Sequence, residues 1–265
     1  MRISLSGTSV LLTGATGGIG HAVARELSDR GAHLTLSGRR ADVLEPLASE
    51  LGALALSADL SKPIDVERLV ADAGEVEILV NNAALPASGT LESFSIEEID
   101  RALAVNLRAP IALAHALVPA MVDRGRGHLV FMSSLSGKAA TPGSALYNAT
   151  KYGLRGFAAA LRADLRSSGV GVSTVFPGFI RDAGMFADAQ VRLPPGVGTR
   201  SPEEVARAVV TAIERNRGEI DVAPLPLRAG AALAGLAPEL SATLGRRLGS
   251  DALSRRIGAG QREKR

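Results

Sequence analysis

Tyr147 and Lys151 form the residue pair whose spacing most directly suggests acid–base chemistry. A separation of four residues places both side chains on one face of a helix, one turn apart. A tyrosine with its ordinary pKa near 10 exchanges protons poorly at neutral pH. An ammonium about 4 Å away favours the phenolate by on the order of 4 kcal/mol, before desolvation offsets part of that gain. We therefore expect Tyr147 to titrate closer to the working pH and to act as a general acid or base.

Ser134 is the third candidate catalytic residue. It ends the run Phe131-Met132-Ser133-Ser134, whose apolar start predicts a strand. In folds built on a parallel sheet, binding and catalytic sites lie at the carboxyl ends of the strands. The Ser134 hydroxyl could hydrogen-bond a substrate carbonyl oxygen and share its developing negative charge with Tyr147. Ser133 and Ser136 stay open as alternatives for this role.

A glycine-rich turn from Thr13 to Gly20 follows the apolar run Ser9 to Leu12 and precedes a helical pattern that stops at Gly31. Glycine tolerates positive φ and has no Cβ, so the backbone can approach a diphosphate at the free N–H groups of a helix N-terminus. This context predicts a dinucleotide site at the following residues: Gly14, Thr16, Gly18, Ile19 and Gly20.

The residues after a second predicted strand, His33 to Leu36, distinguish between two dinucleotides. An acid there would accept hydrogen bonds from the ribose of NAD and would repel the 2′-phosphate of NADP. Gly38 occupies that position, and Arg39 and Arg40 follow it with guanidinium groups suited to phosphate. The sequence favours NADP(H) as the cofactor, with NAD(H) as the alternative.

The elements that must position these residues alternate between strands and helices. Further strands are predicted at 53–57, 78–80, 129–132, 172–176 and 219–222, a helix at 41–51, and a loop at 194–198. Such alternation specifies a parallel sheet covered on both faces. The expected fold class is a doubly wound α/β Rossmann fold with a mostly parallel, seven-stranded sheet, formed by residues 1–223.

The motifs, taken as an ordered set, resemble the short-chain dehydrogenase/reductase family in its single-domain form. The resemblance covers roughly Ser9 to Val222. It consists of the G-x-x-x-G-x-G turn, a serine 13 residues before the tyrosine of the Tyr-x-x-x-Lys pair, and two further segments: Asn81-Asn82-Ala83-Ala84, in which Ala84 replaces a glycine, and Pro177-Gly178-Phe179-Ile180.

The resemblance implies roles for further residues. Lys151 would also hold the nicotinamide ribose, and Asn106 would kink its helix and hold a water that relays protons to that lysine. A threonine that the family usually has shortly after Ile180 is replaced by Arg181-Asp182. The remaining cofactor contacts would come from Asp59, Leu60, Asn82, Ala83, Pro177, Gly178 and Ile180. Association through the helices that carry Asn106 and Tyr147 would give a homodimer or homotetramer.

The implied reaction is hydride transfer between a nicotinamide and a carbonyl or secondary alcohol, with Tyr147 exchanging the proton and no metal involved. Leu, Phe, Met and Val in the segments 86–94 and 181–199 favour a fairly apolar small-molecule substrate. The alternative is a catalytically silent dinucleotide-binding regulator or scaffold, against which the set of Ser134, Tyr147 and Lys151 argues.

Composition and charge limit the partners and the location. The chain has no cysteine, no signal-peptide pattern and no apparent spanning segment, so a cytoplasmic location is expected. Residues 224–265 contain eight Lys or Arg and three Asp or Glu, which leaves a net charge of −2 on the rest and argues against nucleic-acid binding. Leucines from Leu233 to Leu248 predict a basic amphipathic helical extension, which could cover the pocket, contact a partner or membrane surface, or pack on its own domain.

Overall fold

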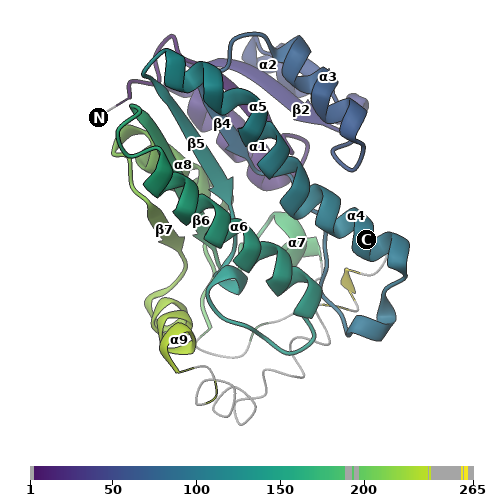
Figure 1. Cartoon of the computed structure of the whole chain (residues 1–265). Coiled ribbons are helices and arrows are strands. Elements are labelled where there is room, and N and C mark those ends of the chain that lie inside the picture. The colour runs from purple at the N-terminus through teal and green to yellow at the C-terminus, as the bar shows by residue number, and fades with distance from the viewer. Residues whose placement is uncertain are drawn as a thin grey trace.

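A sheet of parallel strands runs through the centre of the computed structural model, with helices on both faces (Figure 1). The structure describes residues 3–188, 193, 197–237, 239, 258, 260 and 261. Within these residues the strand order is β3-β2-β1-β4-β5-β6-β7, which confirms the predicted doubly wound fold with seven strands. The strands are β1 (Ser9–Thr13), β2 (His33–Gly38), β3 (Leu54–Ser57), β4 (Ile78–Asn81), β5 (Gly127–Met132), β6 (Val170–Pro177) and β7 (Glu219–Val222).

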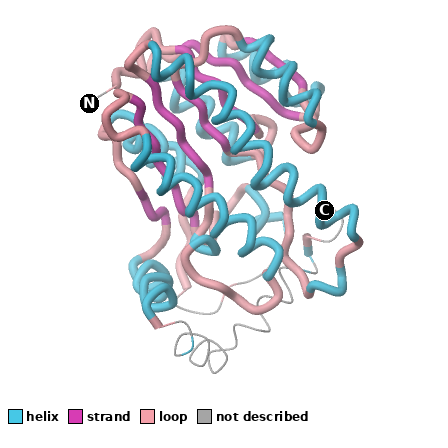
Figure 2. Tube along the Cα trace, in the orientation of Figure 1, coloured by secondary structure: helices cyan, strands magenta, loops and turns pink. Residues whose placement is uncertain are grey.

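Helices connect the strands and form a layer on each face of the sheet (Figure 2). They are α1 (Gly18–Asp29), α2 (Ala41–Leu51), α3 (Pro63–Ala73), α4 (Ile96–Leu103), α5 (Ala109–Asp123), α6 (Ala145–Asp164), α7 (Gly184–Asp188), α8 (Pro202–Glu214) and α9 (Leu225–Leu236). Short 3-10 segments are η1 (Leu91–Ser93) and η3 (Leu135–Gly137), and η2 (Ala104–Arg108) is π-helical. The strand order reverses between β1 and β4, which leaves a crevice at their carboxyl ends.

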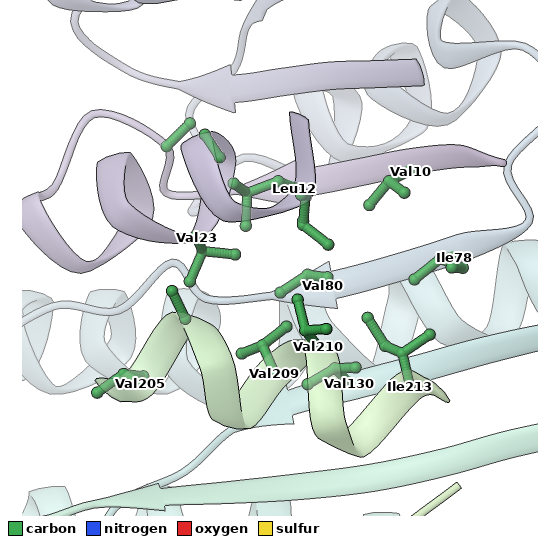
Figure 3. Packing of buried hydrophobic residues seen from close by; sticks show 14 of the residues in the cluster. Val10, Leu12, Val23, Ile78, Val80, Val130, Val205, Val209, Val210 and Ile213 are labelled. Carbon is green, nitrogen blue, oxygen red and sulfur yellow. The ribbon is translucent and has the colours of Figure 1, made fainter. Parts of the chain in front are cut away.

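Alternate residues of each strand supply the core on the two faces of the sheet. Val10 and Leu12 of β1 pack with α1, α2 and α8, whereas Leu11 belongs to the cluster beneath α3, α5 and α6. Figure 3 shows the first cluster, in which Val209 and Ile213 of α8 face the strands. Aliphatic residues buried on both faces fix the register of each strand, because a shift by one residue would exchange the two sets.

The helical stretch from Ile96 to Asp123 is long and apolar enough, by length and composition alone, to cross a membrane. The expectation of no apparent spanning segment missed this stretch. In the structure it comprises α4, η2 and α5, and its apolar residues Leu113 and Met121 are buried against the sheet. Its apolar character therefore serves the core in this fold.

Candidate active site

A cavity of about 1090 Å³ lies at the carboxyl ends of the strands and brings most of the predicted site residues together. Its lining begins at the glycine turn and continues past Asp59 and Tyr147 to α7 and α9, which Figure 1 places beyond the ends of β5 and β6. The predicted site residues on this lining are Gly14, Thr16, Gly18, Ile19, Gly20, Arg39, Arg40, Asp59, Leu60, Asn82, Ala83, Ser134, Tyr147, Lys151, Pro177, Gly178 and Ile180. Asn106 is the predicted residue that does not line it.

The glycine turn is held tightly against the start of the loop after β4. Gly14 has a φ of 68°, and a Cβ there would lie 2.6 Å from the Cα of Ala83. The Asn82 side chain donates from Nδ2 to the carbonyl oxygens of Thr13 and Gly14, at 3.2 and 3.0 Å. Asn82 was predicted as a cofactor contact, and its amide braces the turn.

Helix α1 begins at this turn without a side chain that caps its N-terminus. The first N–H groups of a helix have no intrahelical partners, and here they lie beside the cavity with no capping side chain and no acidic residue in the first turn. A diphosphate fits such a terminus, since N–H groups and the helix dipole both favour an anion.

The two arginines predicted to bind phosphate follow β2 and differ in their contacts. The Arg40 guanidinium donates through Nη2 to the carbonyl oxygen of Thr16, so it is tied to the glycine turn. Arg39 is exposed and lines the cavity. Gly38 lies directly against Thr16, because a Cβ at position 38 would be 2.6 Å from the Thr16 methyl carbon.

Asp59 lies on the cavity wall near this end, together with Leu60. Its Oδ1 accepts hydrogen bonds from the backbone N–H of Ser61 at 3.1 Å and from the Ser61 hydroxyl at 2.8 Å. Burial alone would raise the pKa of the Asp59 carboxyl, but these hydrogen bonds and the charges of Arg39 and Arg101 lower it. Arg101, on α4, also lines the cavity, and no sequence motif pointed to it.

Ser134 and Tyr147 both line the cavity, and the Ser134 hydroxyl is close enough to Tyr147 to lower the pKa of its phenol. The Ser134 hydroxyl also accepts from the backbone N–H of Ser136 at 3.2 Å. Ser133, one of the two alternatives, is buried and donates to the backbone carbonyl of Lys151 at 3.1 Å. Ser133 therefore joins β5 to α6, while the contact with Tyr147 belongs to Ser134.

Tyr147 differs from the expectation of a lowered pKa. Burial raises the pKa of its phenol to about 12, although the hydrogen bond with Ser134 opposes this rise. The Lys151 ammonium lies 5.7 Å from the centre of the Tyr147 ring and donates to the carbonyl oxygen of Met132 at 2.9 Å. The prediction of a lowered Tyr147 pKa was wrong for the protein without cofactor. Desolvation of the phenol outweighs the attraction of the Lys151 ammonium, which is hydrogen-bonded to Met132.

Lys151 is itself strongly affected by its surroundings. Burial lowers the pKa of its ammonium to about 8. With the Tyr147 pKa near 12, the phenol keeps its proton at neutral pH.

Asn106 lies in the π-helical segment η2 and is completely buried. Pro110 has no N–H to donate to the Asn106 carbonyl, and the ladder there shifts so that the Ala109 N–H bonds to the carbonyl of Ala104. The Asn106 side chain accepts from the backbone N–H of Leu85 at 2.6 Å and donates to the carbonyl of the same residue at 2.9 Å. The amide thus fixes the loop after β4, and the water-holding role of Asn106 stays a prediction.

Asn81 is the last residue of β4. Its side chain is buried, but neither amide atom makes a hydrogen bond with the residues that the structure describes. The structure therefore provides no partner that explains this residue.

The segment after β6 forms another wall of the cavity through Pro177, Gly178 and Ile180. Arg181 and Asp182 lie outside the lining. The Arg181 guanidinium is 3.4 Å from the Asp182 carboxylate and 3.9 Å from that of Glu204 on α8. These two positions therefore do not present a side chain to the cavity in place of the family's threonine.

Helix α9 also lines the cavity, through an apolar group of residues: Pro226, Leu227, Gly230, Ala231 and Leu233. The sequence left open whether residues 224–265 cover the pocket, contact a partner or membrane, or pack on their own domain. The first helix of this extension, α9, packs on its own domain and forms part of the pocket wall. Gln261 also lines the cavity and donates from Nε2 to the carbonyl of Met185 at 3.1 Å. The predicted amphipathic pattern at Leu240, Leu244 and Leu248, with most of the tail arginines, lies outside the described residues, as does most of the 194–198 loop.

A family model described as short chain dehydrogenase matches residues 8–192. The ketoacyl reductase HetN of Nostoc sp. is 34% identical over 233 residues, which cover 84% of this chain and 81% of that protein. Dehydrogenase/reductase SDR family member 7B of Xenopus laevis is 34% identical over 259 residues, which cover 89% of this chain and 80% of that protein.

Solved structures agree with these sequence relationships. A short-chain dehydrogenase from Sphingobium yanoikuyae in complex with NADPH has a TM-score of 0.76 and 30% identity, covering 91% of this chain and 94% of that chain. A 3-ketoacyl-(acyl-carrier-protein) reductase from Brucella melitensis complexed with NADH has a TM-score of 0.73 and 28% identity, covering 82% and 98%. The protein therefore belongs to the short-chain dehydrogenase/reductase family, the NAD(P)-dependent oxidoreductases that act on alcohol and carbonyl groups.

Proposed function

We propose that this protein uses NADPH to reduce a carbonyl group on a fairly apolar substrate, with alcohol oxidation as the reverse reaction. The observation that carries the proposal is the pair of Ser134 and Tyr147, which line the cavity that begins at the glycine turn and are close enough for Ser134 to affect the pKa of Tyr147. A bound nicotinamide would supply the hydride, and the remaining chemistry belongs to side chains of this protein.

In this proposal Tyr147, whose phenol holds its proton at neutral pH, donates that proton to the carbonyl oxygen. Ser134 hydrogen-bonds the same oxygen and stabilises the negative charge that develops on it. Lys151 is close enough to the Tyr147 ring to stabilise the phenolate after the proton has left. Asn106 contributes by holding Leu85 and the loop beside the cavity.

The preference for NADPH rests on the charges around one end of the cavity. Arg39, Arg40 and Arg101 line it there, with Asp59 as the acid, and Gly38 occupies the position where an acid would favour NAD. A 2′-phosphate is compatible with this excess of positive charge. One similar structure is an NADPH complex and another is an NADH complex, so the charges of this chain carry the preference.

The apolar substrate is proposed from the side chains around Ser134 and Tyr147. The apolar residues on the lining beyond the cofactor residues include Leu135, Ala139, Ala140, Pro142, Phe179, Met185, Phe186, Leu227, Ala231 and Leu233. Such a wall favours aliphatic or aromatic groups next to the reacting carbonyl. Two of the similar proteins are named as ketoacyl reductases, so 3-oxoacyl thioesters are the first compounds to test.

The test is a screen of the purified full chain with NADPH and NADH against 3-oxoacyl thioesters, aliphatic ketones and steroid ketones. We expect oxidation of NADPH, higher kcat/KM for longer apolar substrates, and a higher KM for NADPH in the Arg39→Ala variant. Absence of turnover with every carbonyl class, or faster turnover with NADH, would contradict the proposal.

Two expectations about the intact protein stand beside this function as proposals. We propose a homodimer or homotetramer that associates through α4, α5 and α6, as the family resemblance implies. We also propose a cytoplasmic location, with peripheral membrane contact through residues 224–265 as the alternative.

A further inference from the structure

Arg101 lines the cavity at the same end as Arg39 and Arg40, although it is remote from both in the sequence. It lies in the last turn of α4, a helix that starts with a capping box between Ser95 and Glu98. Its side chain is half-buried, so it is held partly out of solvent at the cavity wall. A long cationic side chain in such a place needs an anionic partner to offset its desolvation.

The protein provides that partner only in part. The Arg40 guanidinium is bonded to the Thr16 carbonyl, whereas the guanidinium groups of Arg39 and Arg101 make no hydrogen bond or ion pair with any residue that the structure describes. The positive charges of both help to lower the pKa of the Asp59 carboxyl, and all three side chains belong to the lining of one cavity. Arg39 and Arg101 are therefore the two arginines at this end whose donors remain available to a ligand.

We propose that Arg101 binds the 2′-phosphate of NADPH together with Arg39, so that α4 and the end of β2 hold one phosphate between them. The inference rests on the proposed use of NADPH and replaces the pair Arg39 and Arg40 that the sequence predicted. Arg40 then has a different task, which is to hold the glycine turn through Thr16.

The charge balance supports a phosphate monoester as the ligand group. Three guanidinium groups and the Asp59 carboxylate leave a net charge of +2 at this end of the cavity. A phosphate monoester carries about −1.5 to −2 at pH 7, which matches that excess. The diphosphate of the cofactor would not neutralise this positive charge, because it would bind elsewhere, at the N-terminus of α1 beside Gly18 and Ile19.

Calorimetric titration of the full chain with four ligands would test this assignment: NADPH, NADH, adenosine 2′,5′-bisphosphate and ADP. The variants are Arg101→Gln, Arg101→Lys and the matched control Arg108→Gln, which changes an exposed arginine on the same helical stretch outside the cavity lining. We expect Arg101→Gln to weaken NADPH and the bisphosphate by about tenfold to hundredfold, the effect of one lost charge-assisted hydrogen bond. NADH and ADP should bind as before, Arg101→Lys should recover part of the loss, and Arg108→Gln should bind like the wild type.

An equal loss for NADPH and NADH would overturn the inference, because it would mean that Arg101 only supports Asp59 or the fold. Unchanged binding of NADPH to Arg101→Gln would also overturn it. Failure of the proposed function has a different signature, since wild-type protein would then bind NADH at least as tightly as NADPH. A wild-type preference for NADPH that persists in Arg101→Gln would overturn only the role of Arg101.

Discussion

Gly38 stands where an acid would favour NAD, and the structure predicts that introducing one there will fail unless Thr16 is changed as well. A Cβ at position 38 would lie 2.6 Å from the Thr16 methyl carbon and 3.0 Å from its hydroxyl oxygen. The backbone at Gly38 does not have positive φ, so the cost of a side chain is the collision alone. Overpacking of this kind costs about 1–3 kcal/mol, or roughly 2–6 °C in Tm for a chain of this size.

Thermal unfolding of the protein without cofactor measures this collision separately from binding. Gly38→Ala and Gly38→Asp should both lower Tm, and adding Thr16→Ala should restore most of the loss, because the two colliding atoms are removed. Gly156→Ala is the matched control, since a Cβ there meets nothing within 4 Å. Only the double variant that combines Gly38→Asp with Thr16→Ala should then show a lower ratio of NADPH to NADH affinity. A Tm for Gly38→Ala equal to that of the wild type would refute the reasoning.

Three further predictions concern stability and substrate choice. Burial lowers the pKa of Lys151 from 10.5 to about 8, so the unfolded state binds more protons between these values and this contribution to stability rises with pH. The free energy of unfolding of Lys151→Met should therefore be higher than that of the wild type by up to about 3 kcal/mol at pH 7. Chemical denaturation at increasing pH should show this difference fall to zero by about pH 10.5. Asn106→Ala removes both hydrogen bonds to Leu85 and should lower the free energy of unfolding by about 2–4 kcal/mol in the same measurement. A decrease below about 0.5 kcal/mol would contradict the role of Asn106 in holding Leu85. Leu227→Ser should raise KM for long apolar substrates more than for short ones, while the exposed control Leu225→Ser should leave the ratio unchanged.

The sequence predicted the elements whose patterns are local. The helix Ala41–Leu51 and the strand Glu219–Val222 match the predicted ranges, because their ends are set by nearby glycine, arginine and polar residues. The strand Val170–Pro177 begins two residues before its predicted start, at Val170 and Gly171, where pairing with β5 rather than composition decides. The alternation of strands and helices was sufficient to predict a parallel, doubly wound sheet.

Features that depend on distant segments could not be read in the same way. Arg101 lines the cavity from α4, far in the sequence from the glycine turn, and no local motif signals this. The pKa of Tyr147 depends on burial by several elements, whereas the sequence shows only its spacing from Lys151. Pro110, four residues after Asn106, was the available signal for an interrupted helix at that asparagine.

The central claim is that Tyr147 exchanges the proton in a cavity that also binds NADPH. Its most direct test is single-turnover oxidation of NADPH by Tyr147→Phe, with the best carbonyl substrate from the screen, alongside NADPH titration of the same variant. We predict a loss of rate by a factor of about 10²–10⁴ with an unchanged Kd for NADPH, because the ring remains while the hydroxyl is lost. A variant that keeps most of the wild-type rate would contradict this claim.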